Sequence, residues 1–310
     1  MAKYHHIILE TLAPGVFAAI ASPTGAAGSN SGIIDLGDQT IVFDTTATLS
    51  AAQELLSAAQ ELTGRAPKYV INSHSHPDHV HGNAIFSETS ALISSSVTRD
   101  EIARDGIEAM ANMHNDLTTQ VTSFREQLVV SLDASERAEL EAAIEFFGGV
   151  LNGYPAPEDL RIPNVTYHHE LDFHGPARLA RLLTFGGAHS ACDAVLWLPE
   201  QKVLFSGDVI GNPILCLGYP ENWWTILETL ESLGAERIVP GHGEVWSAKA
   251  GYETTRQHLN FMFSVAQQAM DSGNPLHFTE TVPVPAGQSD YWFRKDLRFL
   301  AEHRMAGKLL

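Results

Sequence analysis

The stretch that decides the fold is NSHSHPDHVHG at residues 72–82. A short run, residues 68–71, comes before it and predicts a buried strand, because it is rich in β-branched and aromatic residues. The polar cluster therefore begins where a strand ends, which is where open α/β sheets bind ligands. Five of the eight residues from His74 to His81 carry an imidazole or a carboxylate, the ligands that suit Zn, Fe or Mn. We therefore expect a metal site here.

The spacing of these groups predicts two neighbouring metal positions. His74 and His76 point the same way on an extended segment, because side chains alternate with a period of two. Pro77 cannot continue a strand ladder, so the chain turns there and carries Asp78 and His79 to the adjacent position. This arrangement offers two ligands to one metal ion and two to a second. A His-rich surface loop is the alternative in a chain with 15 His.

Three later segments each supply a residue that can bind a metal. They are GGAHS at 186–190 with His189, FSGD at 205–208 with Asp208, and PGHG at 240–243 with His242. Together with the first motif they resemble the signature of the metallo-β-lactamase fold superfamily, over roughly residues 15–262. The resemblance implies an α/β fold, a four-layer αβ/βα sandwich with a dinuclear metal site at the edge of two facing sheets. It does not fix the substrate, because one fold hosts many chemistries.

The resemblance also implies seven ligands shared between two divalent metal ions, with Zn as the first candidate and Fe or Mn as alternatives. The first ion takes His74, His76 and His189, the second takes Asp78, His79 and His242, and the bridge is Asp208. A bridging carboxylate can hold two cations about 3.5–4 Å apart, as two-metal hydrolysis requires. We assign the catalytic roles to Asp78 and Asp208.

The implied reaction is hydrolysis of a small ester, lactone or thioester by a hydroxide held between the two ions. True β-lactamases of the family lack an Asp ligand at the place of Asp208, so the resemblance favours enzymes similar to glyoxalase II and lactonases. A non-heme iron oxidoreductase on the same scaffold and a β-lactam hydrolase are the alternatives. Tyr154, Tyr219 and His114 are the candidates for a general acid.

The composition argues against several partners and locations. The chain has 19 Lys and Arg against 37 Asp and Glu, a formal net charge of −18, which repels polyphosphates and anionic membranes. We therefore expect a small-molecule substrate, with neither nucleic acid nor membrane as a partner. Two cysteines, Cys192 and Cys216, are too few for a disulfide framework, and we expect Cys192 to be a buried thiol. Without a signal-peptide pattern or a long apolar run, the chain is expected to be cytoplasmic.

The 310 residues fit one large α/β domain, residues 1–310, with two additions. Residues 97–157 predict a two-helix insertion, either a peripheral hairpin or a lid over the metals. In the second case Phe146, Phe147 and Tyr154 would line an apolar pocket. Residues 272–310 predict a C-terminal extension that packs on the core or on a second subunit, which leaves a homodimer open.

Three further expectations concern the sheets. Residues 40–72 predict a strand–helix–strand unit that leads into the first motif. Asp44 ends its strand beside His74, where its carboxylate could accept the free N–H of a ligating imidazole. The alternative is a helix N-cap or turn residue. A Pro-rich connector at residues 155–163 predicts the midpoint between the two halves, so that the second half starts near residue 165.

Overall fold

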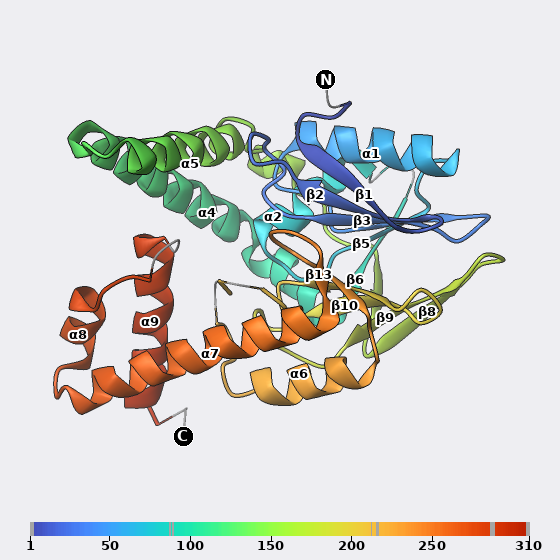
Figure 1. Cartoon of the computed structure of the whole chain (residues 1–310). Coiled ribbons are helices and arrows are strands. Elements are labelled where there is room, and N and C mark those ends of the chain that lie inside the picture. The colour runs from blue at the N-terminus through green and yellow to red at the C-terminus, as the bar shows by residue number, and fades with distance from the viewer. Residues whose placement is uncertain are drawn as a thin grey trace.

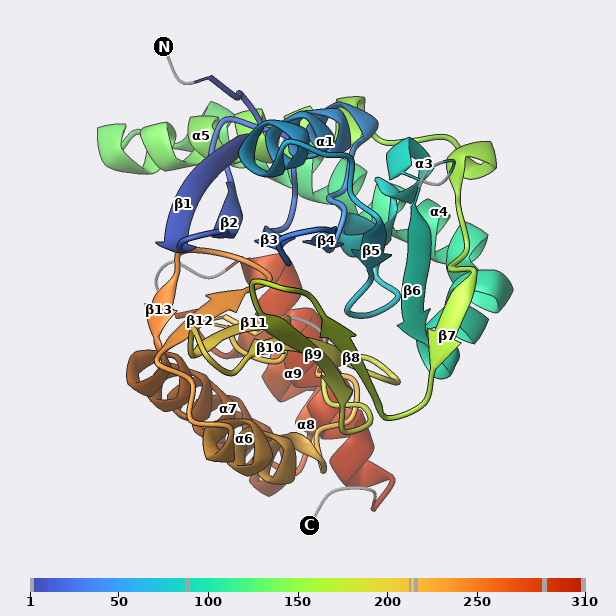
Figure 2. The same cartoon turned by 90° about the vertical axis from the view of Figure 1, so that its right-hand side faces the viewer.

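Two β-sheets face each other, and helices cover their outer sides (Figures 1 and 2). The computed structural model describes residues 3–86, 88, 90–211, 213–214, 217–285 and 289–307. Cys216 and the last three residues of the predicted C-terminal extension lie outside these ranges.

Within the described residues, the first sheet has seven strands in the order β1-β2-β3-β4-β5-β6-β7. The strands from β1 to β4 pair antiparallel, and those from β4 to β7 pair parallel. Their bounds are β1 Ile7–Ala13, β2 Val16–Ala21, β3 Ser31–Asp35, β4 Thr40–Phe43, β5 Tyr69–Ile71, β6 Ala91–Ser95 and β7 Val165–Tyr167.

The second sheet, over the same described ranges, has six strands in the order β13-β12-β11-β10-β9-β8. Its pairings are antiparallel except for the parallel pair of β11 and β12. The bounds are β8 Glu170–His174, β9 Leu179–Thr184, β10 Ala194–Leu198, β11 Val203–Gly207, β12 Arg237–Pro240 and β13 Trp246–Ser247.

The helices connect these strands or extend beyond them. They are α1 Leu49–Thr63, α2 Pro77–Val80, α3 Asn83–Phe86, α4 Ser96–Val130, α5 Ala134–Asn152, the 3₁₀ turn η1 Pro157–Asp159, α6 Trp223–Ser232, α7 Ala248–Asp271, α8 Pro275–Thr281 and α9 Asp290–Met305. The two ends of α1 are set by its capping residues. The Thr48 hydroxyl accepts the N–H of Ala51 at its start, and Gly64 ends it at φ 73°, a left-handed conformation that favours glycine.

Apolar side chains pack between the four layers, which are helix, sheet, sheet and helix. Leu55 of α1 packs on the outer face of the first sheet. Phe43 and Phe205 meet between the two sheets, with ring centroids 6.1 Å apart. Leu204 and Leu227 join the second sheet to α6 on its far side. Each fully buried side chain of this size stabilises the fold by about 1.5–3 kcal/mol. The predicted four-layer αβ/βα sandwich is confirmed.

A helical hairpin projects from the sandwich beside the sheet edges (Figure 1). Its helices, α4 and α5, pack together and are joined by residues 131–133. The C-terminal helices α8 and α9 pack against α7, so the extension covers part of the core, one of the two outcomes predicted for it. Asp116 of α4 ties the hairpin to α9, because its carboxylate accepts from the Tyr291 hydroxyl at 2.5 Å and the Lys295 ammonium at 2.8 Å.

The predicted midpoint of the chain is wrong. β7 follows the Pro-rich connector but pairs with β6 in the first sheet, so the second sheet begins only at β8. The sequence also predicts no strand at β1, which pairs with β2 along its length. The chain does turn at Pro77, and this proline is the first residue of the short helix α2, whose opening turn needs no N–H from it.

Several other expectations stay predictions. These are the single-domain organisation of residues 1–310, the standing of 97–157 as an insertion, the homodimer and the cytoplasmic location. Among the described helices, none combines the length and the apolar character that a membrane span requires.

Candidate metal centre

The predicted ligands follow the carboxyl ends of strands from both sheets. In chain order, His74 and His76 follow β5, Asp78 and His79 lie on α2, His189 follows β9, Asp208 follows β11 and His242 follows β12. The structure brings all seven together in two adjacent groups. In one, candidate ligand atoms of His74, His76, His189 and Asp208 lie within 4.8 Å of one another; in the other, those of Asp78, His79 and His242 do.

Asp208 lies between the two groups. One of its carboxylate oxygens, Oδ2, is 3.3 Å from Nε2 of His189 and 3.3 Å from Nε2 of His242. The other oxygen, Oδ1, is 3.3 Å from Nε2 of His79. A single carboxylate therefore faces imidazoles of both groups, as a bridging ligand must.

Asp44 orients two of the imidazoles from behind. Its carboxylate accepts the Nδ1–H of His79 at 2.8 Å, and it also accepts the backbone N–H and the hydroxyl of Ser73 at 2.7 and 2.8 Å. The Ser73 oxygen in turn lies 2.9 Å from Nδ1 of His74. These bonds leave Nε2 of both rings pointing at the centre. Asp44 adopts φ 61°, a conformation that costs a non-glycine residue about 1–3 kcal/mol and that clusters at functional sites.

Asp193 holds the loop that carries His189. Its carboxylate accepts the backbone N–H groups of Ala188, His189 and Ser190 at 2.7–3.0 Å, and the Ser190 hydroxyl at 2.6 Å. Sequence reasoning gave Asp193 no role. The only signal was its position four residues after a candidate ligand, which is too common to carry an assignment.

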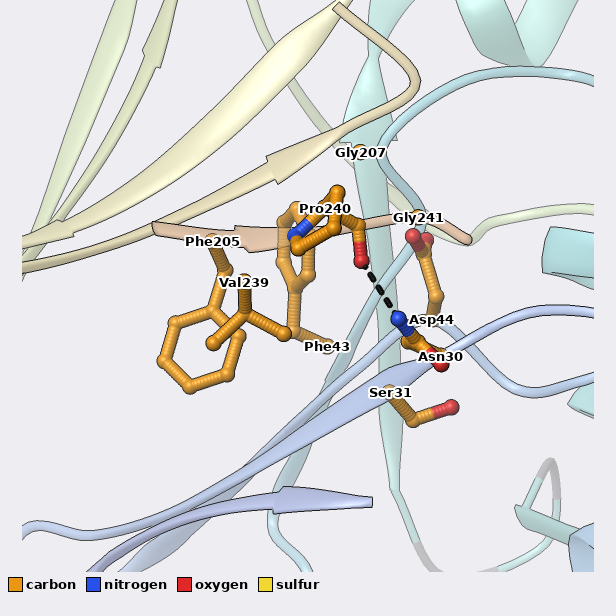
Figure 3. Close-up of a pocket in the computed structure, with 9 residues that line it drawn as sticks. All are labelled: Asn30, Ser31, Phe43, Asp44, Phe205, Gly207, Val239, Pro240 and Gly241. Carbon is orange, nitrogen blue, oxygen red and sulfur yellow. Dashed lines mark hydrogen bonds between the residues drawn. The ribbon is translucent and has the colours of Figure 1, made fainter. Parts of the chain in front are cut away.

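Asn30 holds the loop that carries His242 and joins the two sheets. Its side-chain amide donates to the carbonyls of Pro240 and Gly243, both at 2.8 Å, and its oxygen accepts from Ala21. Figure 3 shows the bond from Asn30, the residue before β3, to Pro240 at the end of β12. The His242 ring donates from Nδ1 to the Gly28 carbonyl at 3.0 Å, which directs Nε2 at the centre. The sequence predicts only a turn around Asn30, because residues 23–32 are rich in Gly, Ser and Ala.

The residues of the centre fit a metal ion. Nε2 of His74, Nε2 of His79 and Oδ1 of Asp208 are buried and make no hydrogen bond within the described chain. Leaving such atoms unsatisfied costs about 1–3 kcal/mol each, whereas imidazole nitrogen and carboxylate oxygen are the ligands that bind Zn or Fe. A Cβ on Gly241 would lie 1.8 Å from Oδ1 of Asp208, so glycine is required for the carboxylate to occupy this place.

The charges of the centre also suit cations. Burial alone would raise the pKa of Asp208, but the imidazoles of His242, His79 and His189 hold this pKa well below its usual range. Burial and the neighbouring His79 hold the pKa of His74 well below 6.5, so this ring is neutral, the form that binds a metal.

A cavity of about 900 Å³ opens onto the centre. Its lining includes His76, Asp78, Asp208 and His242 at one side, and the predicted residues Phe146, Phe147 and Tyr154 of the hairpin region at another. The residues expected to form an apolar pocket beside the centre therefore do so. Leu151 packs in the same apolar cluster as Phe147 and Tyr154, together with Leu117 and Val150.

The three general-acid candidates have different surroundings. The Tyr154 hydroxyl is buried with no hydrogen-bond partner among the described residues, and its ring lies against His81 with centroids 4.7 Å apart. Burial and the Asp78 carboxylate raise the pKa of Tyr154, which keeps its proton in place. His114 and Tyr219 are exposed and do not line the cavity. Cys192 is buried, as predicted, against the Thr184 hydroxyl at 3.1 Å.

Comparison with known sequences decides the family. Residues 24–242 match the family described as the metallo-beta-lactamase superfamily. The chain belongs to this superfamily. The match ends at the last predicted ligand, His242.

Among curated proteins, this superfamily member is similar to a linear primary-alkylsulfatase of Pseudomonas sp. (strain ATCC 19151), with 21% identity over 275 residues, 84% of this chain and 51% of the relative. The chain thus spans about half the length of that enzyme. It is also similar to the Beta-lactamase-like protein 2 homolog of Caenorhabditis elegans, with 40% identity over 58 residues, 18% of this chain and 20% of that protein.

Solved structures of the superfamily show the same fold. A metallo-beta-lactamase from Pontibacter korlensis matches with a TM-score of 0.58 and 17% identity, covering 82% of this chain and 99% of that one. TMB-1 matches with a TM-score of 0.56 and 17% identity, covering 82% and 97%. At this identity the likeness concerns the fold alone.

Proposed function

We propose that this superfamily member hydrolyses a small, uncharged carboxylic ester, lactone or thioester, and that the seven predicted residues hold two divalent metal ions. The observation that carries the proposal is the place of Asp208, 3.3 Å from imidazoles of both groups. In this assignment His74, His76 and His189 serve one ion, Asp78, His79 and His242 serve the other, and Asp208 bridges. Zn is the first candidate, with Fe or Mn as alternatives.

When bound, the two ions would activate a water molecule and polarise the oxygen of the substrate. The chain's own residues do the rest. Asp44 keeps the His79 ring in the orientation that turns Nε2 inward. The Tyr154 hydroxyl, which has no other partner among the described residues, can donate a hydrogen bond to the substrate or its leaving group. Phe146 and Phe147 keep the cavity apolar around the reacting bond.

The charges of the cavity favour an uncharged substrate. Among the described residues that line it there is no Lys or Arg. Its carboxylates come from Asp78, Glu136, Glu139, Asp208, Asp290 and Asp296. The metal ions alone would attract the charge of an anionic substrate, and the carboxylates of the lining would repel it. A neutral ester does not experience this repulsion.

A second candidate is the hydrolysis of an alkyl sulfate ester. The observation that favours it is the similarity to the linear primary-alkylsulfatase along 84% of this chain, since the apolar cavity would suit an alkyl chain. The missing Lys and Arg in the described lining weigh against a sulfate headgroup. An iron-dependent oxidoreductase and a β-lactam hydrolase are the remaining alternatives.

A single substrate panel with metal analysis tests the proposal. The protein is purified without added metal, its metals are counted, and kcat/KM is measured on p-nitrophenyl octanoate, a medium-chain lactone, an acyl thioester, decyl sulfate, a chromogenic β-lactam and RNA. We expect about two metal ions per chain and the highest kcat/KM on a carboxylic ester, lactone or thioester. One tightly bound ion, with no second after addition of Zn or Mn, would contradict the dinuclear assignment. Turnover of decyl sulfate or RNA alone would overturn the substrate class.

A further inference from the structure

A stripe of apolar side chains follows the helical hairpin along the cavity. We call the lining residues on α4, α5, α7 and α9 the helical wall; the hairpin and α9 extend from the same side of the sandwich (Figure 1). In the hairpin the apolar lining includes Met113, Leu117 and Phe124 of α4, and Leu140, Phe147 and Val150 of α5. Spacings of three, four and seven residues place each set on one face of its helix. The two faces together make a continuous apolar surface.

The near end of this stripe begins at the metal centre. Ala47 lies beside Asp78, because a Cβ on Gly28 would contact the Cβ atoms of both, at 2.7 and 3.3 Å. Tyr154 and Phe147 pack in one apolar cluster with Ala47. The cavity that holds the stripe is also lined by Asp78 itself. Anything that lies over the stripe is therefore adjacent to the place where the substrate would react.

The far end of the stripe lies where the lining of the hairpin becomes polar. The ring of Phe124 is 5.9 Å from that of Phe147, measured between centroids. Phe124 lies on the same helix as Met113, about 16 Å further along its axis. Nearer the tip of the hairpin the lining residues are the exposed Gln127, Glu136 and Glu139. The apolar surface therefore has a defined length.

The rest of the helical wall offers no alternative to apolar contact. Met262 of α7 and Trp292 and Phe293 of α9 line the same cavity. Gln120 and His258 also belong to the wall, but Oε1 of Gln120 and Nε2 of His258 are buried and expose almost no surface to a ligand. The described lining contains no Lys or Arg. A ligand that extends from the metal centre along the hairpin meets neither a cation nor an accessible acceptor from these two side chains.

We propose that the stripe holds the acyl chain of the substrate, so that the protein takes esters, lactones or thioesters of medium to long acyl chains. This inference rests on the proposed function for the carbonyl at the metal centre. Phe124, Phe146 and Phe147 are only half-buried, and a chain would remove their remaining apolar surface from water. An extended alkyl chain advances about 1.3 Å per carbon, so roughly twelve carbons span the stripe from Met113 to Phe124. Phe124 thus contacts the end of the chain.

Equilibrium binding of uncharged ketones tests the stripe without depending on turnover. The metal-loaded protein is titrated with 2-hexanone, 2-octanone, 2-decanone and 2-dodecanone, and displacement of the uncharged dye Nile red gives each Kd. These ketones present a carbonyl to the metal centre and cannot be hydrolysed. We expect Kd to fall about twofold to fourfold for each added carbon, as burial of a methylene gives. Kd values that agree within twofold across the series would overturn the proposal.

Two variants and one control assign the chain-length effect to the stripe. Phe124→Ala should weaken binding of 2-dodecanone at least about fivefold and leave 2-hexanone within twofold, because only the longer chain reaches this ring. Phe147→Ala, nearer the metal centre, should already weaken 2-octanone. Phe17→Ala makes the same change at a half-buried phenylalanine of β2 outside the cavity lining, and should leave every Kd unaltered.

Thermal melting checks that each variant is folded, and the wild-type series decides the proposal even if one variant is not. A folded Phe124 variant that binds long and short ketones as the wild type does would overturn the path along the hairpin. Failure of the hydrolytic proposal gives a different result, because a chain that hydrolyses none of the esters would still show the ketone series. Conversely, equal binding of all ketones together with fast hydrolysis of acetate esters would overturn the acyl-chain inference alone.

Discussion

The two ends of the cavity are built by different means. At the sheet edges each candidate ligand is positioned by buried polar groups, among them Asp44 behind His79 and Asp193 behind the His189 loop. In the helical wall the lining is mostly apolar, and the buried acceptors of Gln120 and His258 have no partner within the described chain. Hydrogen bonds fix the ligand atoms in place, whereas apolar packing defines only a shape. The sheet edges should therefore control the chemistry, and the helical wall should control the choice of substrate.

The largest effect is expected at the sheet edges, from Asp208→Ala. The change removes the carboxylate that faces both groups, so kcat/KM on the best substrate should fall by at least about a thousandfold and at least one metal ion should be lost. The folded state should survive, because Asp208 contributes no apolar packing. Kinetics, elemental analysis and thermal melting measure this. Asp100→Ala, at an exposed carboxylate of α4, is the control. Near wild-type turnover would make Asp208 a structural residue only.

Asp44→Asn should have the next largest effect. Asparagine also tolerates the left-handed backbone of this position, so the change isolates the carboxylate. The two carboxylate oxygens of Asp44 accept from the backbone N–H of Ser73 and from the His79 ring, and an amide has only one oxygen for both. Metal affinity or kcat/KM should therefore fall about tenfold to a hundredfold. Competition with a chelator measures the affinity. The control Asp35→Asn, at the ion pair with Arg65, should leave the metal affinity unaltered. Equal affinities in both variants would contradict the orienting role.

Tyr154→Phe tests the boundary between the two regions. Tyr154 lines the cavity, and its buried hydroxyl has no partner among the described residues. Its removal should lower kcat by at least about tenfold with metal content unchanged. Tyr167→Phe provides a matched control, since that hydroxyl is also buried and unpartnered but lies between the sheets, outside the cavity lining. A higher KM with an unchanged kcat would assign Tyr154 to the helical wall.

The smallest effect is expected in the wall, from Phe147→Ala. The lost apolar contact should raise KM, or change the ranking of ester substrates, by about threefold to tenfold with both metal ions retained. Steady-state kinetics on esters of different chain length shows this. Leu132→Ala, at the exposed tip of the same hairpin, should change nothing. A folded, metallated Phe147 variant with identical kinetics on every substrate would remove the wall from substrate choice.

The sequence predicted the sheet-edge region far better than the helical wall. Four of the candidate ligands follow one strand within six residues: His74, His76, Asp78 and His79. Over so short a segment the sequence spacing determines where the side chains point. Asp44 could be placed because β4 and β5 are parallel neighbours, so their carboxyl ends meet.

The remaining features depend on contacts between distant segments. β7 is three residues long with two exposed positions, so no periodicity could show which sheet it joins. Gln120 and His258 are 138 positions apart in the numbering and share a cavity only because α4, α7 and α9 converge there. Asparagine is common in turns, so its residue type gives no sign of a role at position 30. Its hydrogen bonds to the carbonyls of Pro240 and Gly243 form only when the two sheets are packed together.

The connection between β6 and β7 has a practical consequence for protein engineering. The two strands are parallel neighbours, and a parallel pair needs a crossover of only a dozen residues or so. The chain instead runs from residue 96 to 164 and includes both hairpin helices. Helices from another protein could be transplanted between these two anchor points while the strands keep their pairing. Directed evolution of new substrate ranges should therefore begin with libraries of this crossover, leaving the sheet edges untouched.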